Sequence, residues 1–319
     1  MSDLVTRAEV IKLARTLDVA GVQCRPLESL GAEDLRRLRQ HMSAVLFNGD
    51  RQRFRRLAEI VRIVPPAVAA TIAERAFGPL ITARVAGLVP VPKAVEIIKY
   101  VGVMFLADAV VELDPRTAPD LIRAAPTQTE VDVGLEVLER GDHVTVGRFV
   151  DFVTDETIRA IVDRIRDDEQ LLRVAFYVEV PEQLDRLFSL LPQDRKRGIA
   201  RSAVAGSTEL RLASLSLLSR VSDTLRTELG DLAAEAPEPT LDDFVMTAVK
   251  EGATAELLTA ISGMGPASQD KVARLPAFSD DAVLEALARA AADTGQQTEL
   301  KAFAERMDRD SQRRLAQMA

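Results

Sequence analysis

The sequence has no tryptophan, few other aromatic residues, two histidines and one cysteine. Aromatic residues make up 4% of its 319 residues, so platforms that stack bases or sugars are not expected. The histidines, His41 and His143, have no partner at metal-ligand spacing. A single cysteine, Cys24, excludes an internal disulfide and a zinc site built on several cysteines. We therefore predict that the protein uses no metal and no cofactor.

Motifs typical of common enzymes are also missing. The segment Ala205-Gly206-Ser207 does not complete the Gly-x-Ser-x-Gly motif of hydrolases, and no strand is predicted before it. No phosphate-binding loop is present, and Gly263-Met264-Gly265-Pro266 lacks the third glycine of a dinucleotide-binding fingerprint. These observations favour a non-enzymatic protein.

Long apolar runs are absent as well. The run from Ile63 to Ala73 has 11 residues and two prolines, which is too short to span a bilayer. The N-terminus carries acidic residues early and has no cleavage-site pattern, so we predict no signal peptide. Together with the single cysteine, this indicates a cytoplasmic protein without a transmembrane segment, and it leaves peripheral membrane contact open.

What the sequence does have is regularly spaced turns between short apolar stretches. Pro65, Pro90 and Pro115 are 25 residues apart. Similar turns recur at roughly the same interval, a length that holds two short helices which need a stacked neighbour to bury their apolar faces. The turns lie at Val64-Pro65, Val89-Pro90, Asp114-Pro115, Arg140-Gly141, Asp167-Asp168 and Leu191-Pro192. We predict an all-α fold, a right-handed α-solenoid of short helix pairs with a repeat of about 25 residues, as in HEAT or armadillo proteins.

The repeats suggest four segments. Residues 1–62 are predicted to form an N-terminal helical cap with a loop around Gly21–Gly31, and residues 63–230 the repeat array. Residues 231–240, which are acidic and hold two prolines, are the predicted linker. Residues 241–319 are predicted to form further helical repeats.

The turn Leu190–Arg195, of sequence LLPQDR, and the rhythm of short helix pairs resemble two known families. These are the N-terminal helical domain of MgtE-type magnesium transporters and the middle domain of the flagellar protein FliG. The resemblance covers residues 60–230 and implies a superhelical regulatory or docking module. No membrane domain and no nucleotide-sensing pair of domains follows, and the resemblance assigns no magnesium ligand.

The segment Arg51–Val64, of sequence RQRFRRLAEIVRIV, predicts a basic amphipathic helix. Its candidate interaction surface consists of Arg51, Arg53, Arg55 and Arg56. Such a surface can dock an acidic protein, grip nucleic-acid phosphates or lie on anionic lipid. The alternative is a solvated face of an ordinary repeat helix.

The segment Ile261–Leu275 resembles a helix-hairpin-helix element. In that family the turn, here Gly263-Met264-Gly265, presents backbone N–H groups to a DNA phosphate, and Lys271 and Arg274 could add positive charge. The segment Met307–Ala316 has the same frame without the glycines, which favours an ordinary structural turn.

A third candidate lies in the most apolar stretch. Phe77, Tyr100, Met104 and Phe105 could line an apolar groove. If the charged residues of this stretch also face that groove, it could hold an apolar carboxylate such as a fatty acid. These charged residues are Arg75, Arg84, Lys99 and Asp108. The alternative is that they point outward from amphipathic helices, because burying them unpaired would be costly.

The distribution of charge bears on which partner is favoured. The net charge is −8, yet residues 1–62 hold 12 Lys and Arg against 8 Asp and Glu. An acidic balance argues against general coating of nucleic acid but permits a local basic patch. We predict a scaffold or regulatory protein that binds another protein. The alternatives are a nucleic-acid-associated protein, which is not favoured, and an apolar-ligand or lipid binder.

Overall fold

The computed structural model describes residues 4–17, 19–49 and 51–318, without the side chains of residues 43, 44, 46–49 and 51. Every regular element in these ranges is a helix, so the prediction of an all-α protein is confirmed. Contacts divide the chain into two compact units. The N-terminal unit comprises Thr6–Arg166 with Tyr177–Glu179, and the C-terminal unit comprises mainly Asp167–Phe176 and the residues from Val180 onward.

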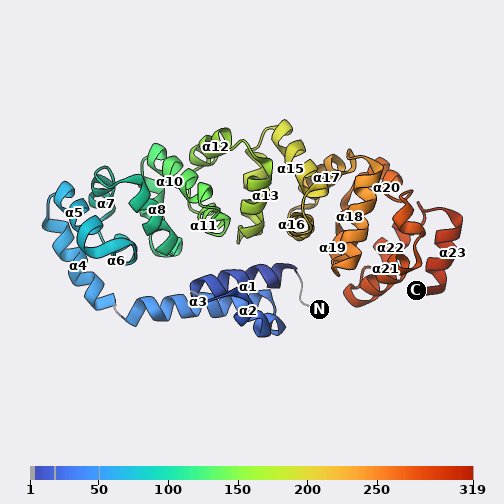
Figure 1. Ribbon diagram of the computed structural model, residues 1–319, viewed down its shortest axis with the longest axis horizontal. Coiled ribbons are helices and arrows are strands. Elements are labelled where there is room, and N and C mark those ends of the chain that lie inside the picture. Colours follow the sequence, from blue (N-terminus) through green and yellow to red (C-terminus); the bar gives the residue numbers. More distant parts are fainter. Residues whose placement is uncertain (1–3, 18, 50, 319) are drawn as a thin grey trace. The chain divides into compact units, whose positions relative to one another are not determined.

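The helices are short throughout (Figure 1). Those that lie wholly or mostly in the N-terminal unit are α1 (Leu4–Thr16), α2 (Gly21–Cys24), η1 (Arg25–Leu30), α3 (Ala32–Gly49), α4 (Arg51–Ile63), α5 (Pro66–Ile72), η2 (Ala73–Phe77), α6 (Gly78–Ala86), α7 (Val91–Ile98), α8 (Val103–Glu112), η3 (Pro115–Thr117), α9 (Pro119–Ala124), α10 (Thr127–Glu139), α11 (His143–Phe149) and α12 (Asp155–Arg164).

The remaining helices belong mostly or wholly to the C-terminal unit. They are α13 (Asp168–Tyr177), α14 (Pro181–Ser189), α15 (Gln193–Ala205), α16 (Thr208–Leu218), α17 (Asp223–Ala234), α18 (Glu238–Lys250), α19 (Thr254–Gly263), α20 (Pro266–Val272), η4 (Pro276–Ser279), α21 (Asp281–Thr294), α22 (Gln297–Ala304) and α23 (Arg309–Met318).

The turns marked in the sequence coincide with the starts of helices. A helix begins at or within two residues after each of the six turns. Elsewhere, Thr154 and Ser207 act as N-caps, because their hydroxyls accept hydrogen bonds from the backbone N–H of Thr157 and Leu210. Proline in the first turn starts α14 at Pro181, since its missing N–H would have had no partner inside the helix.

Two local predictions differ from the structure. The predicted loop around Gly21–Gly31 is wrong, because it contains α2 and η1, which bury the side chain of Cys24. Most of the predicted linker at 231–240 is helical, since only residues 235–237 separate α17 from α18. The two prolines that suggested a linker lie beside and inside the first turn of α18, where proline is well tolerated.

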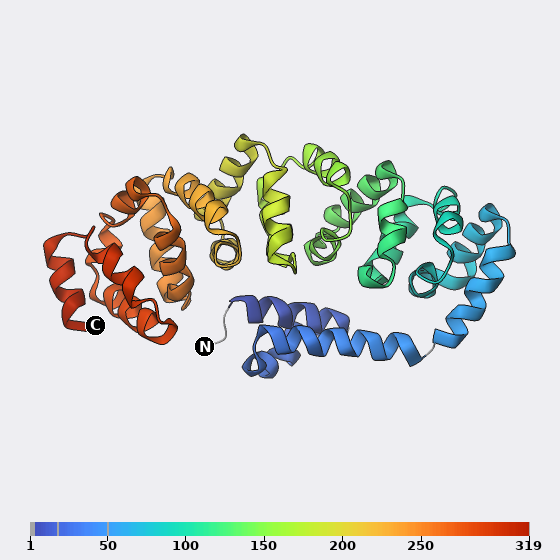
Figure 2. The ribbon, with the colours of Figure 1, turned by 180° about the vertical axis from the view of Figure 1, so that it is seen from behind.

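In the N-terminal unit, most helices from α4 onward pack against the next α-helix but one. The pairs are α4 with α6, α6 with α8, α8 with α10, α10 with α12, α5 with α7 and α7 with α9. Figures 1 and 2 show α6, α8 and α10 as successive neighbours from both sides. Small side chains allow this spacing, because Ala83 of α6, Ala94 of α7 and Ala107 of α8 are all buried at the contacts.

The C-terminal unit repeats this arrangement along α15, α17, α19, α21 and α23. Its core is aliphatic apart from Phe278 and Phe303, whose rings meet edge to face with centroids 5.1 Å apart. A cavity of about 60 Å³ lies in this core, lined almost wholly by apolar side chains such as Leu172 and Phe244. Ser214 also lines it, but its hydroxyl donates to the carbonyl of Arg211, so we assign no ligand to this cavity.

We predict that Gly87→Ala destabilises the protein. A Cβ added to Gly87 would lie 2.4 Å from the carbonyl oxygen of Thr117, so the backbone between α6 and η3 would have to move. Overpacking of this kind costs about 1–3 kcal/mol. Urea unfolding followed by circular dichroism measures the change in free energy.

Gly21→Ala is the matched control. An added Cβ meets no atom within 4 Å at Gly21, so the free energy of unfolding is expected to change by less than about 0.5 kcal/mol. Equal stability of the Gly87→Ala protein and the unmodified protein would contradict the close approach of α6 and η3.

Candidate functional site

The predicted basic helix is α4, and its two sides differ sharply. Phe54, Leu57, Ala58 and Val61 pack into the core of the N-terminal unit. Arg53, Arg55 and Arg56 are exposed, as the sequence predicts for an interaction surface. The side chain of Arg51, the fourth predicted residue, lies outside the described part of the chain.

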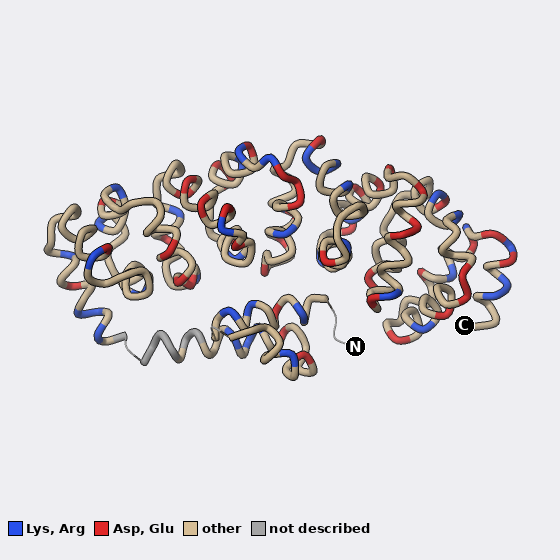
Figure 3. The backbone as a smooth tube through the Cα atoms, viewed as in Figure 1, with Lys and Arg blue, Asp and Glu red and all other residues tan. Residues whose placement is uncertain are grey.

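The exposed side of α4 also carries two isoleucines. Arg53, Arg56, Ile60 and Ile63 are spaced by three, four and three residues, which places them on one face of the helix. We call these four residues the α4 stripe. Ile60 is 54% exposed and Ile63 is 79% exposed, the highest value among the large apolar side chains that the structure describes. In Figure 3 the basic residues of α4 appear as blue segments.

The Gly263 turn is held by polar contacts from α17. The N–H of Gly265 donates to Oδ1 of Asp231 at 2.8 Å, and the carbonyl of Gly263 accepts from Thr227 at 2.6 Å. A Cβ on Gly263 would lie 2.5 Å from Cδ of Arg226, so close packing accounts for this glycine. A phosphate at Gly265 would have to displace a carboxylate, which agrees with the alternative of a structural turn.

The basic residues predicted beside this turn lie in different surroundings. Lys271 donates to the carbonyls of Ala234 and Ala236 at 2.6 and 2.8 Å, which stabilises the C-terminal end of α17. Arg274 is exposed. The similarity between the segments starting at Met264 and Met307 has a structural basis, because Gln269 and Gln312 each donate to the carbonyls five and seven residues earlier.

The predicted groove residues lie on η2, α8 and the turn before α8. Tyr100 and Met104 are 61% and 59% exposed, while Phe77 and Phe105 are half-buried. Among the charged residues of this stretch, Asp108 pairs with Arg140 of α10, and Arg75 and Lys99 are exposed. Arg84 is half-buried. The side chains of Arg75, Lys99 and Asp108 therefore lie on the outside.

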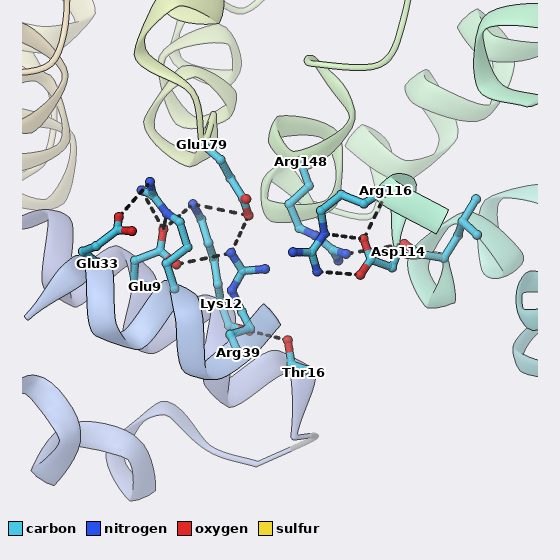
Figure 4. Close-up of polar contacts among 11 residues, drawn as sticks. Glu9, Lys12, Thr16, Glu33, Arg39, Asp114, Arg116, Arg148 and Glu179 are labelled. Carbon is cyan, nitrogen blue, oxygen red and sulfur yellow. Dashed lines mark hydrogen bonds and ion pairs between the residues drawn. The ribbon is translucent and has the colours of Figure 1, made fainter. Parts of the chain in front are cut away.

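The most unusual chemistry of the chain was not predicted from the sequence. A cluster of charged side chains lies within the N-terminal unit, where α1 and α3 meet Glu179 (Figure 4). Glu9, Lys12 and Arg39 are only 1%, 2% and 3% exposed. Charged groups are almost never buried so deeply unless they are paired. We call this group, together with Arg36, Glu179, Asp114, Arg116 and Arg148, the ionic cluster.

Glu9 lies at the centre of one half of the cluster. Its carboxylate accepts from Lys12 at 3.1 Å and from Arg36 and Arg39 at 3.3 Å. Glu179, which follows α13, accepts from Arg39 at 2.7 Å and lies 4.0 Å from Lys12. The two carboxylates therefore share the cations of α1 and α3.

The other half contains residues from around η3 and from α11. Both carboxylate oxygens of Asp114 accept from the guanidinium of Arg116, at 2.9 and 2.6 Å, a bidentate pairing. Arg148 of α11 donates to the carbonyl of Leu113 over 3.5 Å. Figure 4 shows Arg116 and Arg148 on the side of Glu179 opposite to Glu9.

The surroundings shift the acidity of these groups. Burial alone would raise the pKa of Glu9, but attraction to Lys12, Arg39 and Arg36 outweighs burial and holds its pKa below the ordinary value. Burial lowers the pKa of Lys12, and Glu9 and Glu179 only partly offset that effect. A carboxylate with a lowered pKa is a poor proton donor or acceptor near neutral pH, so Glu9 is suited to binding charge rather than to acid–base catalysis.

Sequence analysis could not find the cluster because its members are far apart in the chain. Arg39 lies 30 residues from Glu9 and 140 residues from Glu179. The local signals are the spacing of three between Glu9 and Lys12, which is common on exposed helix faces, and the closeness of Asp114 and Arg116 in the sequence. Long-range packing alone distinguishes a buried pair from an exposed one.

Further observations concern metals, membranes and relatives. Within the described ranges, no group of three or more His, Cys, Asp or Glu residues could hold a metal ion. No helix in this part of the chain combines the length and apolar character needed to cross a bilayer. Comparisons with protein-family models, curated proteins and solved structures gave no match. A function therefore has to be inferred from the residues themselves.

We predict that Glu9→Gln strongly destabilises the protein at pH 7. The neutral amide would leave Lys12 and Arg39 buried with too little negative charge, and breaking a buried ion pair costs about 3–5 kcal/mol. Urea unfolding gives the free energy. Glu33→Gln is the control, because Glu33 also pairs with Arg36 but is 64% exposed, and its loss is expected to cost less than about 1 kcal/mol.

The same pair of variants tests the pH dependence. Because the pKa of Glu9 is lowered in the folded protein, its contribution is complete above the unfolded pKa of about 4.3 and is lost as pH falls through the folded pKa. The stability difference between the unmodified protein and Glu9→Gln should therefore shrink below about pH 4. A difference that stays constant down to pH 3 would contradict the charged state of Glu9.

Proposed function

We propose that this protein is a non-enzymatic helical-repeat scaffold or regulatory protein that binds another protein through the α4 stripe. The single observation that carries the proposal is the exposure of Ile60 and Ile63 next to arginines on a helix whose other side packs into the core. A contiguous exposed surface with apolar and basic character is typical of a binding site.

The proposal includes a right-handed α-solenoid of helix pairs as the scaffold. In the N-terminal unit, the helices that pack in succession begin at Gly78, Val103, Thr127 and Asp155. These intervals agree with a repeat of about 25 residues, in which each unit contacts only its neighbours. In the C-terminal unit the corresponding helices begin at Gln193, Asp223, Thr254 and Asp281, so the proposed repeat is longer there.

The chemistry of the stripe defines the partner. Covering an isoleucine side chain that was exposed to water gains about 1.5–3 kcal/mol, so two of them can anchor a partner helix or strand with apolar side chains. Arg56 and Arg53, about one and two turns from Ile60, would attract carboxylates on that partner. We therefore expect a protein segment in which apolar residues adjoin Asp or Glu.

Nucleic acid and lipid fit the stripe less well. Phosphates would leave Ile60 and Ile63 in water, and the net charge of −8 repels a polyanion. An amphipathic helix binds a bilayer by burying its apolar face, but in α4 that face is already packed into the core. A protein partner is the one that uses both the arginines and the isoleucines.

Site-specific photo-crosslinking in the cells that produce the protein tests this function. A photoreactive amino acid at position 63 should capture one protein partner, and the same amino acid at Met246, which is 39% exposed in the C-terminal unit, should not. Adding Ile60→Asp or Arg56→Glu should reduce the yield at position 63 at least tenfold, because each change removes the apolar or the basic half of the stripe.

Two results would overturn the proposal. One is a crosslink to nucleic acid or lipid in place of protein. The other is a crosslinked protein whose yield does not respond to Ile60→Asp or Arg56→Glu. Ile60 is more than half exposed, so Ile60→Asp should leave the urea midpoint nearly unchanged, and a loss of binding can then be attributed to the surface.

A further inference from the structure

Helices α1 to α3, which we call the N-terminal arm, have an apolar core of their own. Its buried members are Val10, Leu13, Ala14, Cys24 and Leu35, and Leu27, Leu38 and Met42 pack against them. All of these residues lie on α1, α2, η1 or α3. Glu9 adds ion pairs to Lys12, Arg36 and Arg39 inside the arm. The arm is therefore held together by contacts between its own helices.

Ion pairs join the arm to the rest of the N-terminal unit. The guanidinium of Arg15 donates to both carboxylate oxygens of Asp142, with 2.5 Å between Nη1 and Oδ1. Arg39 donates to Glu179 at 2.7 Å, and Lys12 lies 4.0 Å from the same carboxylate (Figure 4). The arm thus places cations on two carboxylates, one at the start of α11 and one after α13.

The backbone of the arm is not closely packed against the later helices. Among the described residues, the principal helix–helix contacts of α3 are with η1 and α4, and none of the principal contacts joins α1 or α3 to a helix after α4. Long side chains such as those of Arg15 and Arg39 therefore span the junction. A junction of this kind loses less apolar contact area on opening than one between packed helices.

The ion pairs of the junction are unfavourable to bury. Arg39 is 3% exposed, and its Nε finds no acceptor within the described part of the chain, so part of its hydration is lost without replacement. The mutual attraction of two buried ions often does no more than offset the loss of their hydration. Arg15 is 35% exposed, so water partly screens its pair with Asp142. Opening the junction returns both ions of each pair to water and therefore costs little free energy.

We propose that the N-terminal arm is an ionic latch, which closes over Asp142 and Glu179 and opens as a folded unit when these carboxylates lose its cations. In the closed state the side chains of Asp142 and Glu179 are 10% and 14% exposed. In the open state both carboxylates face water, while the apolar core of the arm stays intact. The closed arm thus blocks an acidic surface.

The latch is tethered and therefore reversible. The chain continues from α3 into α4, and α4 is anchored by its own apolar side in the core of the N-terminal unit. An open arm stays at high effective concentration near Asp142 and Glu179, so it closes again without a second molecule. The latch uses none of the residues of the α4 stripe, so it is independent of the function proposed above.

Double electron–electron resonance between two spin labels on the full chain tests the latch. The labels are introduced as non-canonical amino acids, because Cys24 is buried in the core of the arm. Labels at Ile11 of α1 and Glu139 of α10, both exposed, report on the junction. We expect one narrow distance distribution at about 50 mM salt and an added broad population at about 1 M salt, because salt screens the pairs that water reaches.

Labels at Ile11 and His41 show whether the arm stays folded. Both residues are exposed, and they lie on α1 and α3 within the arm. Their distance distribution should be the same at both salt concentrations, since the core between these helices does not depend on the junction.

The double variant Asp142→Asn, Glu179→Gln is decisive. It removes both carboxylate charges from the junction, and asparagine at position 142 still caps α11. At low salt the open population should rise by about fivefold or more. The double variant Asp120→Asn, Glu59→Gln is the matched control, because these exposed carboxylates pair only with arginines of their own helices. It should leave the open population unchanged.

Two outcomes would overturn the latch. One is a distance distribution between positions 11 and 139 that the double variant at Asp142 and Glu179 leaves unchanged. The other is a distribution between positions 11 and 41 that broadens together with the first pair, which would mean that the arm unfolds instead of opening. If the double variant does not fold, the response of the labelled, otherwise unmodified protein to salt decides in its place.

Discussion

Much of the fold depends on contacts between an α-helix and the next α-helix but one. A helix of six to fourteen residues is marginal alone in water, and here its apolar side is covered by the next α-helix but one. Alanine at the contacts keeps these neighbours close, as at Ala83 and Ala107. The scarcity of aromatic residues follows from the same constraint, because large rings would hold the short helices too far apart.

The ionic cluster is the exception to this apolar construction. Burying a charge is unfavourable even when it is paired, and apolar side chains of similar size often stabilise a protein as much or more. Glu9, Lys12 and Arg39 therefore contribute little to stability that leucine or methionine could not supply. We infer that these pairs favour one alignment of α1 with α3 and Glu179, because an ion pair is more directional than an apolar contact.

Much of the fold could be predicted from the sequence, and less of the candidate site. Proline, Asp and Ser at turns act through their own backbone, so helix starts such as Pro181 and Thr208 follow from local chemistry. The prediction of a loop around Cys24 was wrong, because helices as short as α2 and η1 form only with tertiary contacts and leave no local signal in the sequence. Arg53, Arg55 and Arg56 were found from charge alone. The exposure of Ile60 and Ile63 depends on which side of α4 meets the core, and the ionic cluster depends on pairs up to 140 residues apart.

The next-but-one pattern of contacts also bears on how this chain tolerates change in its length. Within each unit, a helix that follows this pattern makes most of its contacts with a few nearby elements. Removing or duplicating a pair of helices would thus disturb one junction and leave the packing on both sides of it intact. Within a unit, a whole pair of helices is therefore the smallest insertion or deletion that preserves the next-but-one contacts on either side of it.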